Sequence, residues 1–508
     1  MFQELLSNIM IGWHVSVSPA NLLYCLFGVS VGMVVGIIPG IGALAAMTML
    51  FPLTFHVEPL SALIMMAGIW YGTTYGGSIT TILLNLPGEA KNAVTCLDGY
   101  PMAKAGRAGV ALFMTSVASF FGASIGIIIM MTFSSSIAEV AIRFSAAEYF
   151  SMMVLGLIAS AVIADAPIYK SIGMAILGIL VGLVGMDVQT GAMRMTFGQI
   201  ELMDGINLIA MAMGVFGIAE VLSSLRTVQI QKIETRFSMR SMLPTGTEMR
   251  QSWGAMFRGA GVGSFLGILP GTGPAVSAFM SYAIERRVAR EPSRFGKGAI
   301  EGIMGPETAN NAADQTAFIP TLLLGVPGSA TMALMIGIMM IHGVAPGPAI
   351  LREDADLFWG LIMSFWIGNA ILLIMNIPFI GIWIKILKIP YYYIYPAIIM
   401  FICIGAYSVN SSTYDLFVVA IFGLLGYAMR ITGYPAAPLI LGYILGPMME
   451  ENMRRALQLS GGDYSTFFTR PISGSIVAFT VFVLVWGVWS TIRMKRRTAN
   501  APHMGEDL

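Results

Sequence analysis

The feature that most limits how this chain can fold is a series of long apolar runs. The clearest of them cover residues 108–132, 206–222, 357–376 and 472–492. A helix of about 20 apolar residues is long enough to cross a hydrocarbon core of about 30 Å. Only 11% of the 508 residues are charged, whereas soluble domains carry about 25%. We therefore expect an all-α polytopic membrane protein. The alternating segments of roughly ten residues that build a membrane β-barrel do not occur in the sequence.

Composition and motifs also argue against several classes of function. The net charge of +1 gives no basis for a nucleic-acid partner. The four histidines and three cysteines have no metal-ligand spacing, and no Gly-x4-Gly-Lys phosphate-binding loop occurs. Residues 28–32 spell Gly-x-Ser-x-Gly, but they lie in an apolar helical run rather than at a strand-to-helix turn. We expect no enzymatic activity, no cofactor and no bound metal, with Na⁺ considered only as a coupling ion.

The two halves of the chain carry the same motifs in the same order. GIIPGIG at 36–42 recurs as GILPGTG at 267–273, an offset of 231 positions. LLNLPGEA at 83–90 resembles LLGVPGSA at 323–330, an offset of 240. Further matches follow at an offset of 245. Offsets that increase in order along the chain predict a duplication with small insertions.

Loop charges predict that the two repeats have opposite orientations. Lys and Arg favour the cytoplasmic side of a membrane. The loop 98–107 is basic, whereas its counterpart 352–356 reads REDAD. The loop 51–58 has no Lys or Arg, whereas its counterpart 285–297 has five. The sequence therefore predicts two inverted structural repeats, an architecture common among transporters.

The same charges predict re-entrant hairpins and a domain organisation. Only one apolar stretch, 259–284, lies between two basic segments, so we expect it to enter and leave on the same side, with 28–50 as its counterpart. This gives about 11 spans plus 2 hairpins and places the basic run 493–497 in the cytoplasm. The expected organisation is an N-terminal interfacial or outer segment at 1–27, membrane repeat 1 at 28–222, a basic cytoplasmic linker at 223–258, membrane repeat 2 at 259–450, and a last span with a basic C-terminal tail at 451–508.

Pro-Gly pairs interrupt the apolar runs at repeat-matched positions. Broken helices persist at membrane depth only where protein or a water-filled cavity covers the freed backbone groups. Freed carbonyls can bind Na⁺, and the N-terminus of the following helix can bind an anion. The alternative is a structural kink at each proline, but four paired breaks favour a central site. The breaks are Pro39-Gly40, Pro87-Gly88, Pro270-Gly271 and Pro327-Gly328.

Polar residues cluster around these breaks, and we expect the segments 36–42, 78–88, 267–277 and 310–331 to meet near the membrane midplane. Hydroxyls and amides can bind carboxylates and Na⁺, although any single Ser or Thr can instead bond to a helix carbonyl. For an organic anion we predict Asn85, Gly88, Gly271, Asn310, Asn311, Gly328 and Ser329. For a coupling cation we predict Gly40, Ser78, Thr80, Thr81, Thr272, Asp314 and Thr316. The remaining acidic candidates, which either carry protons or lie in interfacial loops, are Glu89 and Glu307.

Several long motifs between about residues 20 and 450 resemble the large membrane subunit, TctA, of bacterial tripartite tricarboxylate transporters. They are GIIPGIGALAA, YGGSITTILLNLPGEAKNAVTCLDGYPMAKAGRAG, GILPGTGPAVSAFMSYAIE, PETANNAADQTAFIPTLLLGVPGSA and IHGVAPGP. The resemblance implies a secondary transporter that takes up citrate-like carboxylates with Na⁺ or H⁺. It also implies two partners, a small TctB-like membrane subunit and a periplasmic TctC-like solute-binding protein. The chain departs from the family pattern at Asp314, whose charge would repel a carboxylate unless it were protonated or bound to a cation.

Taken together, these features predict the large transmembrane subunit of a binding-protein-dependent symporter for tricarboxylate-like organic anions. We expect it in the bilayer of the bacterial inner membrane, multi-pass, with a cytoplasmic C-terminus. An elevator-like motion of a domain that carries the hairpins is a further hypothesis. The alternative function is a passive anion channel or a non-transporting membrane scaffold. The choice of carboxylate, the choice between Na⁺ and H⁺, the N-terminal side and the formation of a homo-oligomer stay open.

Overall fold

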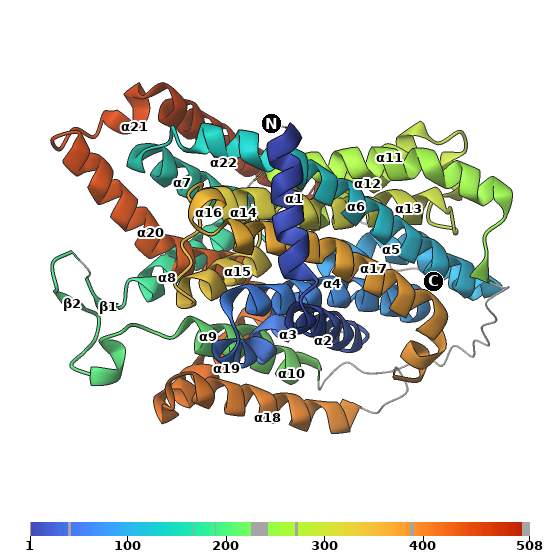
Figure 1. Ribbon diagram of the computed structural model, residues 1–508, viewed down its shortest axis with the longest axis horizontal. Coiled ribbons are helices and arrows are strands. Elements are labelled where there is room, and N and C mark those ends of the chain that lie inside the picture. Colours follow the sequence, from blue (N-terminus) through green and yellow to red (C-terminus); the bar gives the residue numbers. More distant parts are fainter. Residues whose placement is uncertain are drawn as a thin grey trace.

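Helices dominate the computed structural model of the chain (Figure 1). The structure describes residues 2–38, 42–164, 166–187, 189–224, 242–269, 273–386 and 391–499. In these residues the only sheet is a pair of short antiparallel strands, β1 (Gly185–Met186) and β2 (Met193–Arg194). The expected all-α fold is confirmed.

The described part of the first half forms ten α-helices and several shorter helical turns. Their bounds are α1 (Phe2–Ser16), α2 (Pro19–Gly36), α3 (Ala43–Leu50), η1 (Phe51–His56), α4 (Pro59–Leu84), η2 (Ala90–Asn92), α5 (Ala93–Met102), η3 (Ala103–Arg107), α6 (Ala108–Ala141), α7 (Ala146–Ile163), α8 (Ile168–Gly182), η4 (Ile200–Leu202), α9 (Leu208–Ala212), η5 (Met213–Ile218) and α10 (Ala219–Ser224).

The second half begins with a helix that takes up part of the expected linker. Residues 246–258 belong to this helix, and residues 225–241 lie outside the described part of the chain. The bounds are α11 (Gly246–Ile268), α12 (Gly273–Val288), η7 (Pro292–Arg294), α13 (Glu301–Thr316), α14 (Phe318–Leu324), α15 (Ala330–Ile341), α16 (Ile350–Glu353), α17 (Ala355–Ile386), α18 (Tyr391–Asn410), α19 (Thr413–Thr432), α20 (Ala437–Leu459), α21 (Thr466–Thr469) and α22 (Pro471–Ala499).

Two helix pairs, one from each half, pack through stripes of glycine. A methyl group added to any glycine of the two stripes would lie 2.1–2.6 Å from a backbone oxygen of the partner helix. Only glycine permits this approach, which is typical of helix packing in membranes. The second stripe follows the first by 231 positions and its partner residues by 240, the same offsets as the sequence repeat. The glycines are Gly28, Gly32 and Gly36 of α2, which face α4, and Gly259, Gly263 and Gly267 of α11, which face α13.

The two halves are intertwined rather than separate. In the core, α6 of the first half packs against α13, and its counterpart α17 packs against α4. At the other side, α8 packs against α20, and its counterpart α19 packs against η5. Each half therefore completes the packing of the other. Inversion of the repeats across the bilayer stays a prediction.

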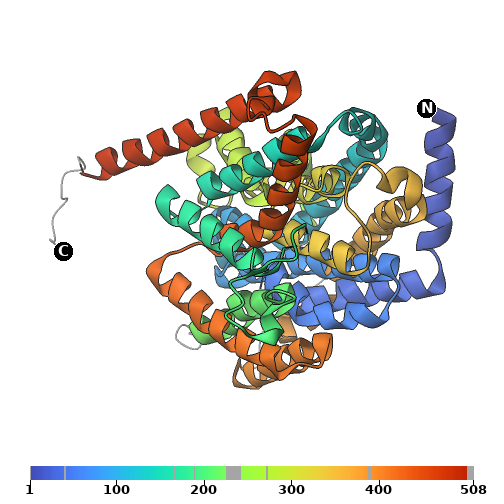
Figure 2. The same cartoon turned by 90° about the vertical axis from the view of Figure 1, so that its left-hand side faces the viewer.

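Several helices have the length and composition of membrane spans. Among the described residues six helices meet this description, and five shorter helices are also apolar. The chain is therefore a multi-pass membrane protein, whereas the expected 11 spans and 2 hairpins stay a prediction. Two helices stand apart from the main bundle. Figure 1 shows α1 lying across α17, and Figure 2 shows α22 extending away from the rest of the protein.

Two of the four expected breaks lie in the described part of the chain, and both fall between helices. Asn85, directly after α4, and Gly325, directly after α14, adopt left-handed backbone conformations with φ of 58° and 63°. The chain turns there, and Pro87-Gly88 and Pro327-Gly328 follow in the connecting segments. The other two pairs lie outside the described residues, between α2 and α3 and between α11 and α12. The two described Pro-Gly pairs therefore mark helix ends rather than kinks within continuous helices.

Candidate functional site

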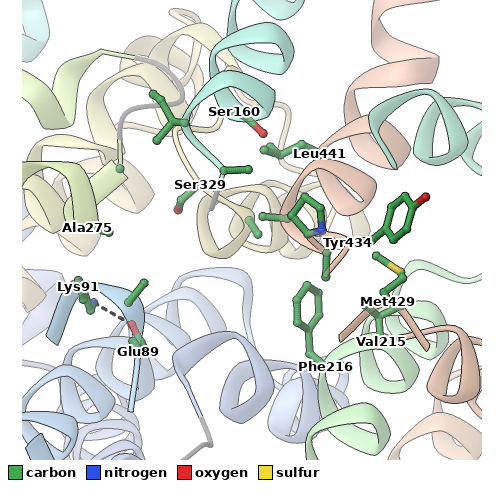
Figure 3. Close-up of a pocket in the computed structure, with 18 of the residues that line it drawn as sticks. Glu89, Lys91, Ser160, Val215, Phe216, Ala275, Ser329, Met429, Tyr434 and Leu441 are labelled. Atoms are coloured by element: carbon green, nitrogen blue, oxygen red, sulfur yellow. Dashed lines mark ion pairs between the residues drawn. The ribbon is translucent and has the colours of Figure 1, made fainter. Parts of the chain in front are cut away.

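A cavity of about 730 Å³ lies where segments of both halves meet (Figure 3). Two of these segments directly follow Pro-Gly breaks, namely 89–91 and 328–330. A third is the start of α12 at 273–275. The remaining wall comes from the ends of α7 and α19, from η5 and from the start of α20. The volume falls within the range of about 300–1,000 Å³ of small-molecule sites.

Two helix N-termini border this cavity. Ser329 has extended backbone angles, and its hydroxyl accepts a hydrogen bond from the Met332 N–H at 3.2 Å, so it caps α15. The start of α12 lies alongside, because a Cβ on Gly273 would be 3.9 Å from the carbonyl oxygen of Gly328. First-turn N–H groups have no partners within their own helix and carry partial positive charge. Both ends therefore favour an anion in the cavity.

The first half fills the equivalent position with its own carboxylate. Glu89, which lies 240 positions before Ser329, accepts a hydrogen bond from the N–H of Ala43 at the start of α3. In the second half the side chain at this position is a short hydroxymethyl group. A carboxylate from outside the chain could therefore occupy, at α12, the place that Glu89 occupies at α3.

Opposite these helix starts the wall is largely apolar and aromatic. Figure 3 shows Met429 and Tyr434 across the cavity from Glu89 and Lys91, with Phe216 between the two sides. Apolar walls with few polar groups are typical of sites for small organic molecules, since the walls cover the carbon skeleton and the polar groups orient it.

A buried ammonium group connects the cavity to the protein interior. Lys91 lines the cavity, yet its side chain is only 2% exposed. Its Nζ lies 2.8 Å from Asp314 Oδ2 and 3.4 Å from Glu89 Oε2, and it donates a hydrogen bond to the Thr74 hydroxyl at 2.7 Å. Asp314 Oδ1 is buried and has no hydrogen-bond partner within the described part of the chain. Two carboxylates thus share one ammonium group.

A second buried carboxylate lies seven residues earlier on the same face of α13. Glu307 is fully buried and accepts hydrogen bonds from the hydroxyls of Ser78 at 2.7 Å, Thr95 at 3.0 Å and Ser119 at 3.2 Å. Its placement in an interfacial loop, one of the two alternatives drawn from the sequence, is therefore wrong. The cluster joins α4, α5 and α6 to α13 and brings the two halves together at their polar residues.

The structure separates the predicted anion-binding residues into two groups. Gly328 and Ser329 line the cavity. Asn85 is exposed at the end of α4. Three others lie elsewhere. Gly88 lies against Gly77, and Asn310 and Asn311 are buried in α13, where the side-chain amide of Asn311 donates a hydrogen bond to the side-chain oxygen of Asn310 at 2.6 Å. Gly271 lies outside the described residues.

The predicted cation-binding residues divide in a similar way. Ser78 and Asp314 belong to the buried polar network described above. Thr80 and Thr81 both donate to the carbonyl of Gly77, at 2.8 and 2.7 Å, and Thr316 donates to the carbonyl of Ala312 at 3.1 Å. These three hydroxyls make the intrahelical bonds that the sequence left open as the alternative. Gly40 and Thr272 lie outside the described residues.

Sequence reasoning missed Lys91. The residue lies beside apolar segments, four positions after Pro87, and two positions after Glu89. Ionisable residues in membrane segments usually face a cavity or pair with one another. Applied here, the rule would have drawn attention to Lys91 beside Glu89, which was already a candidate.

Comparison with known proteins gives the family. Residues 22–441 match the model of the tripartite tricarboxylate transporter TctA family. A protein of Agrobacterium vitis described as "Uncharacterized 52.8 kDa protein in TAR-I ttuC' 3'region" is 44% identical over 493 residues, 97% of this chain and 98% of the relative. Another from that organism, "Uncharacterized protein in TAR-II ttuC' 3'region", is 46% identical over 234 residues, 46% of this chain and 97% of the relative. No solved structure matches the chain. The chain belongs to the tripartite tricarboxylate transporter TctA family.

Proposed function

We propose that this protein is the large transmembrane subunit of a secondary transporter that imports tricarboxylate-like organic anions across the bacterial inner membrane. A gradient of Na⁺ or H⁺ drives the uptake, and a periplasmic solute-binding protein supplies the anion. Membership of the TctA family supports the role of a transporter membrane subunit. The choice of an organic anion as cargo rests in addition on the cavity.

The observation that carries the proposal is the pair of helix N-termini at the cavity wall. The starts of α12 and α15 supply backbone N–H groups, and Ser329 adds a hydroxyl. Pro274, the second residue of α12, has no N–H and contributes no donor there. At these two helix starts, backbone N–H groups and a hydroxyl can hold a carboxylate without a charged side chain beside it.

A second feature supports a carboxylate rather than a neutral solute. At the equivalent place in the first half, a carboxylate of the chain itself, that of Glu89, meets the start of α3. The backbone geometry around the breaks recurs in both halves, with left-handed residues Asn85 and Gly325 before each segment. The first half therefore serves as an internal example of a carboxylate held at this type of helix end.

The two further partners are proposed from the family. The word tripartite in the family description supports a complex of three components. We take the other two to be a TctB-like small membrane subunit and a TctC-like periplasmic binding protein. A periplasmic partner supports an inner-membrane location, and the basic run 493–497 supports a cytoplasmic C-terminus.

Uptake measurements in proteoliposomes test the proposal. The full chain is reconstituted with the small membrane subunit, and its binding protein is added outside with radiolabelled citrate, tartrate, malate or succinate. We expect at least one carboxylate to accumulate above its external concentration, and only when an inward Na⁺ or H⁺ gradient and the binding protein are both present. Equilibration without accumulation, independent of the gradient and the binding protein, would favour the passive channel. No flux of any of the four carboxylates would reject the proposal.

A further inference from the structure

Lys91 belongs to two environments at once. It forms part of the cavity wall, and it also makes a buried ion pair with Asp314 across the boundary between the two halves. The carboxylate of Asp314 is 1% exposed and meets Lys91, which lies in the segment that follows α4. A charge that enters the cavity beside Lys91 therefore changes the electrostatic environment of Asp314 directly.

The charges around Lys91 do not balance. Glu89 and Asp314 supply two negative charges against the one positive charge of Lys91. A lysine ammonium group has three N–H donors, and three acceptors surround this one, namely Thr74, Asp314 and Glu89. A carboxylate that enters the cavity can bind Lys91 only by replacing one of these acceptors, and it raises the negative charge of the cluster further.

The second oxygen of Asp314, Oδ1, is available as a cation ligand. Oδ1 of this buried carboxylate has no hydrogen-bond partner within the described residues. A buried carboxylate oxygen left without a partner is costly, because desolvation removes water and nothing replaces it. A monovalent cation at Oδ1 would supply the partner and cancel one negative charge.

We propose that Lys91 couples the two ligands of the transporter: a monovalent cation bound at Asp314 releases Lys91, which then binds a carboxylate of the substrate. One cation per carboxylate leaves the net charge of the cluster the same as in the empty site. The cation is Na⁺ or H⁺, since both can neutralise Asp314. The inference rests on the proposed function, because it assigns a residue and a coupling rule to that anion site.

Other charged or titratable groups face Asp314 and belong to the same balance. Lys91 and Glu89 face it from the segment after α4, Tyr71 from α4 itself, and Glu307 from the preceding turns of α13. The hydroxyl of Tyr71 donates to Gln315 at 2.9 Å. Glu307 is surrounded by the three hydroxyls described above. Lys91 is therefore the positive charge in this group that a substrate can reach from the cavity.

Binding measurements on the purified full chain in nanodiscs test the coupling. The probe is citrate, or whichever of the four carboxylates the wild-type protein accumulates. Its affinity is measured with Na⁺ or choline as the only cation, at mildly acidic and mildly alkaline pH. We expect the wild-type affinity to rise about 5- to 150-fold with the coupling cation. The Na⁺ arm and the pH arm identify which cation is used.

Two single variants separate the roles of the residues. Asp314→Asn imitates the neutralised state, so we expect citrate to bind with the same affinity whether or not the cation is present. Lys91→Met removes the group that binds the carboxylate, and we expect the affinity to fall about 30-fold or more. Lys104→Met and Asp415→Asn remove the same charges outside this cluster and should bind like the wild type, with intact cation dependence.

Three outcomes would overturn the inference. They are full cation dependence in Asp314→Asn, loss of all citrate binding in folded Asp314→Asn, or wild-type affinity in Lys91→Met. If either single variant fails to fold because a buried charge is left unpaired, the double variant Lys91→Met with Asp314→Asn replaces it. That variant should bind citrate weakly and without cation dependence, and wild-type behaviour would contradict the inference. A wild-type protein that accumulates no carboxylate would instead contradict the proposed function.

Discussion

Replacement of Ser329 by glutamate gives a direct test of the anion site, because it copies the first half of the chain into the second. Glu89 already places a carboxylate at the start of α3. Ser329 is the equivalent position next to the start of α12, where a Cβ on Gly273 would lie 3.9 Å from the carbonyl oxygen of Gly328. A glutamate at 329 should therefore occupy the place proposed for the substrate carboxylate.

The expected size of the effect follows from the charge. A carboxylate at position 329 and a substrate carboxylate bound beside α12 would lie about 5 Å apart, and at an effective dielectric constant of about 20 they repel by about 3 kcal/mol. This corresponds to an affinity loss on the order of 100-fold. Competition for the same N–H groups adds to this loss. Ser329→Gln has nearly the same shape without the charge, so we expect a much smaller effect from that control.

Uptake and binding of the transported carboxylate are the assays. Ser329→Glu should reach the membrane in the same amount as Ser329→Gln and show at least the calculated loss in affinity relative to it. Equal affinity of the two variants would refute the placement of the anion at these helix starts, because a negative charge cannot lie beside a bound carboxylate without effect.

Three further predictions concern stability. Asp98 accepts hydrogen bonds from three backbone N–H groups and from Tyr282, so Asp98→Ala should destabilise the protein by about 3 kcal/mol; an unchanged Tm in detergent would contradict this. Gly263→Ala places a methyl group 2.1 Å from a carbonyl oxygen and should cost about 1–3 kcal/mol. Gly261→Ala, with nothing within 4 Å, should not lower the Tm, because alanine favours a helix more than glycine does; an equal drop in Tm in both variants would argue against the stripe. A bidentate hydrogen bond from Arg194 lowers the pKa of Glu450 below its ordinary value. The stabilisation that this ion pair gives the folded state is therefore present at pH values above the ordinary glutamate pKa, and it is lost only as the pH falls through the lowered pKa. The rate of amide hydrogen exchange in residues 183–207, corrected for the intrinsic pH dependence of exchange, should therefore stay constant down to about pH 4.5. Local unfolding of this segment that begins at higher pH would contradict the prediction.

The sequence was most informative about the backbone. The pairs Pro87-Gly88 and Pro327-Gly328 interrupt helices where predicted, since a residue without an N–H and one without a side chain act on the main chain wherever they occur. The offsets of 231 and 240 reappear in the glycine contacts because the same residues that define the motifs also define the distance between the helices. Local chemistry determined both features.

The sequence was less informative about which polar groups meet. Thr80 and Thr81 looked like cation ligands, but a threonine in a helix can always reach a carbonyl of its own helix, and both do so. The partnership of Lys91 with Asp314 joins residues 223 positions apart. The apolar wall of the cavity around Tyr434 comes from helices that carry no motif. Such contacts depend on tertiary packing, which no local pattern of residues specifies.

The most direct test of the anion site is chemical labelling at the cavity. A variant in which Cys25, Cys96 and Cys403 are replaced by alanine receives a single cysteine, either Ser329→Cys in the cavity or Phe197→Cys on the exposed loop after β2. With a water-soluble thiol reagent, the account predicts that the transported carboxylate slows labelling at 329 in the presence of the coupling cation and leaves labelling at 197 unchanged. Labelling at 329 that the carboxylate does not alter, in a protein that still transports it, would contradict the central claim.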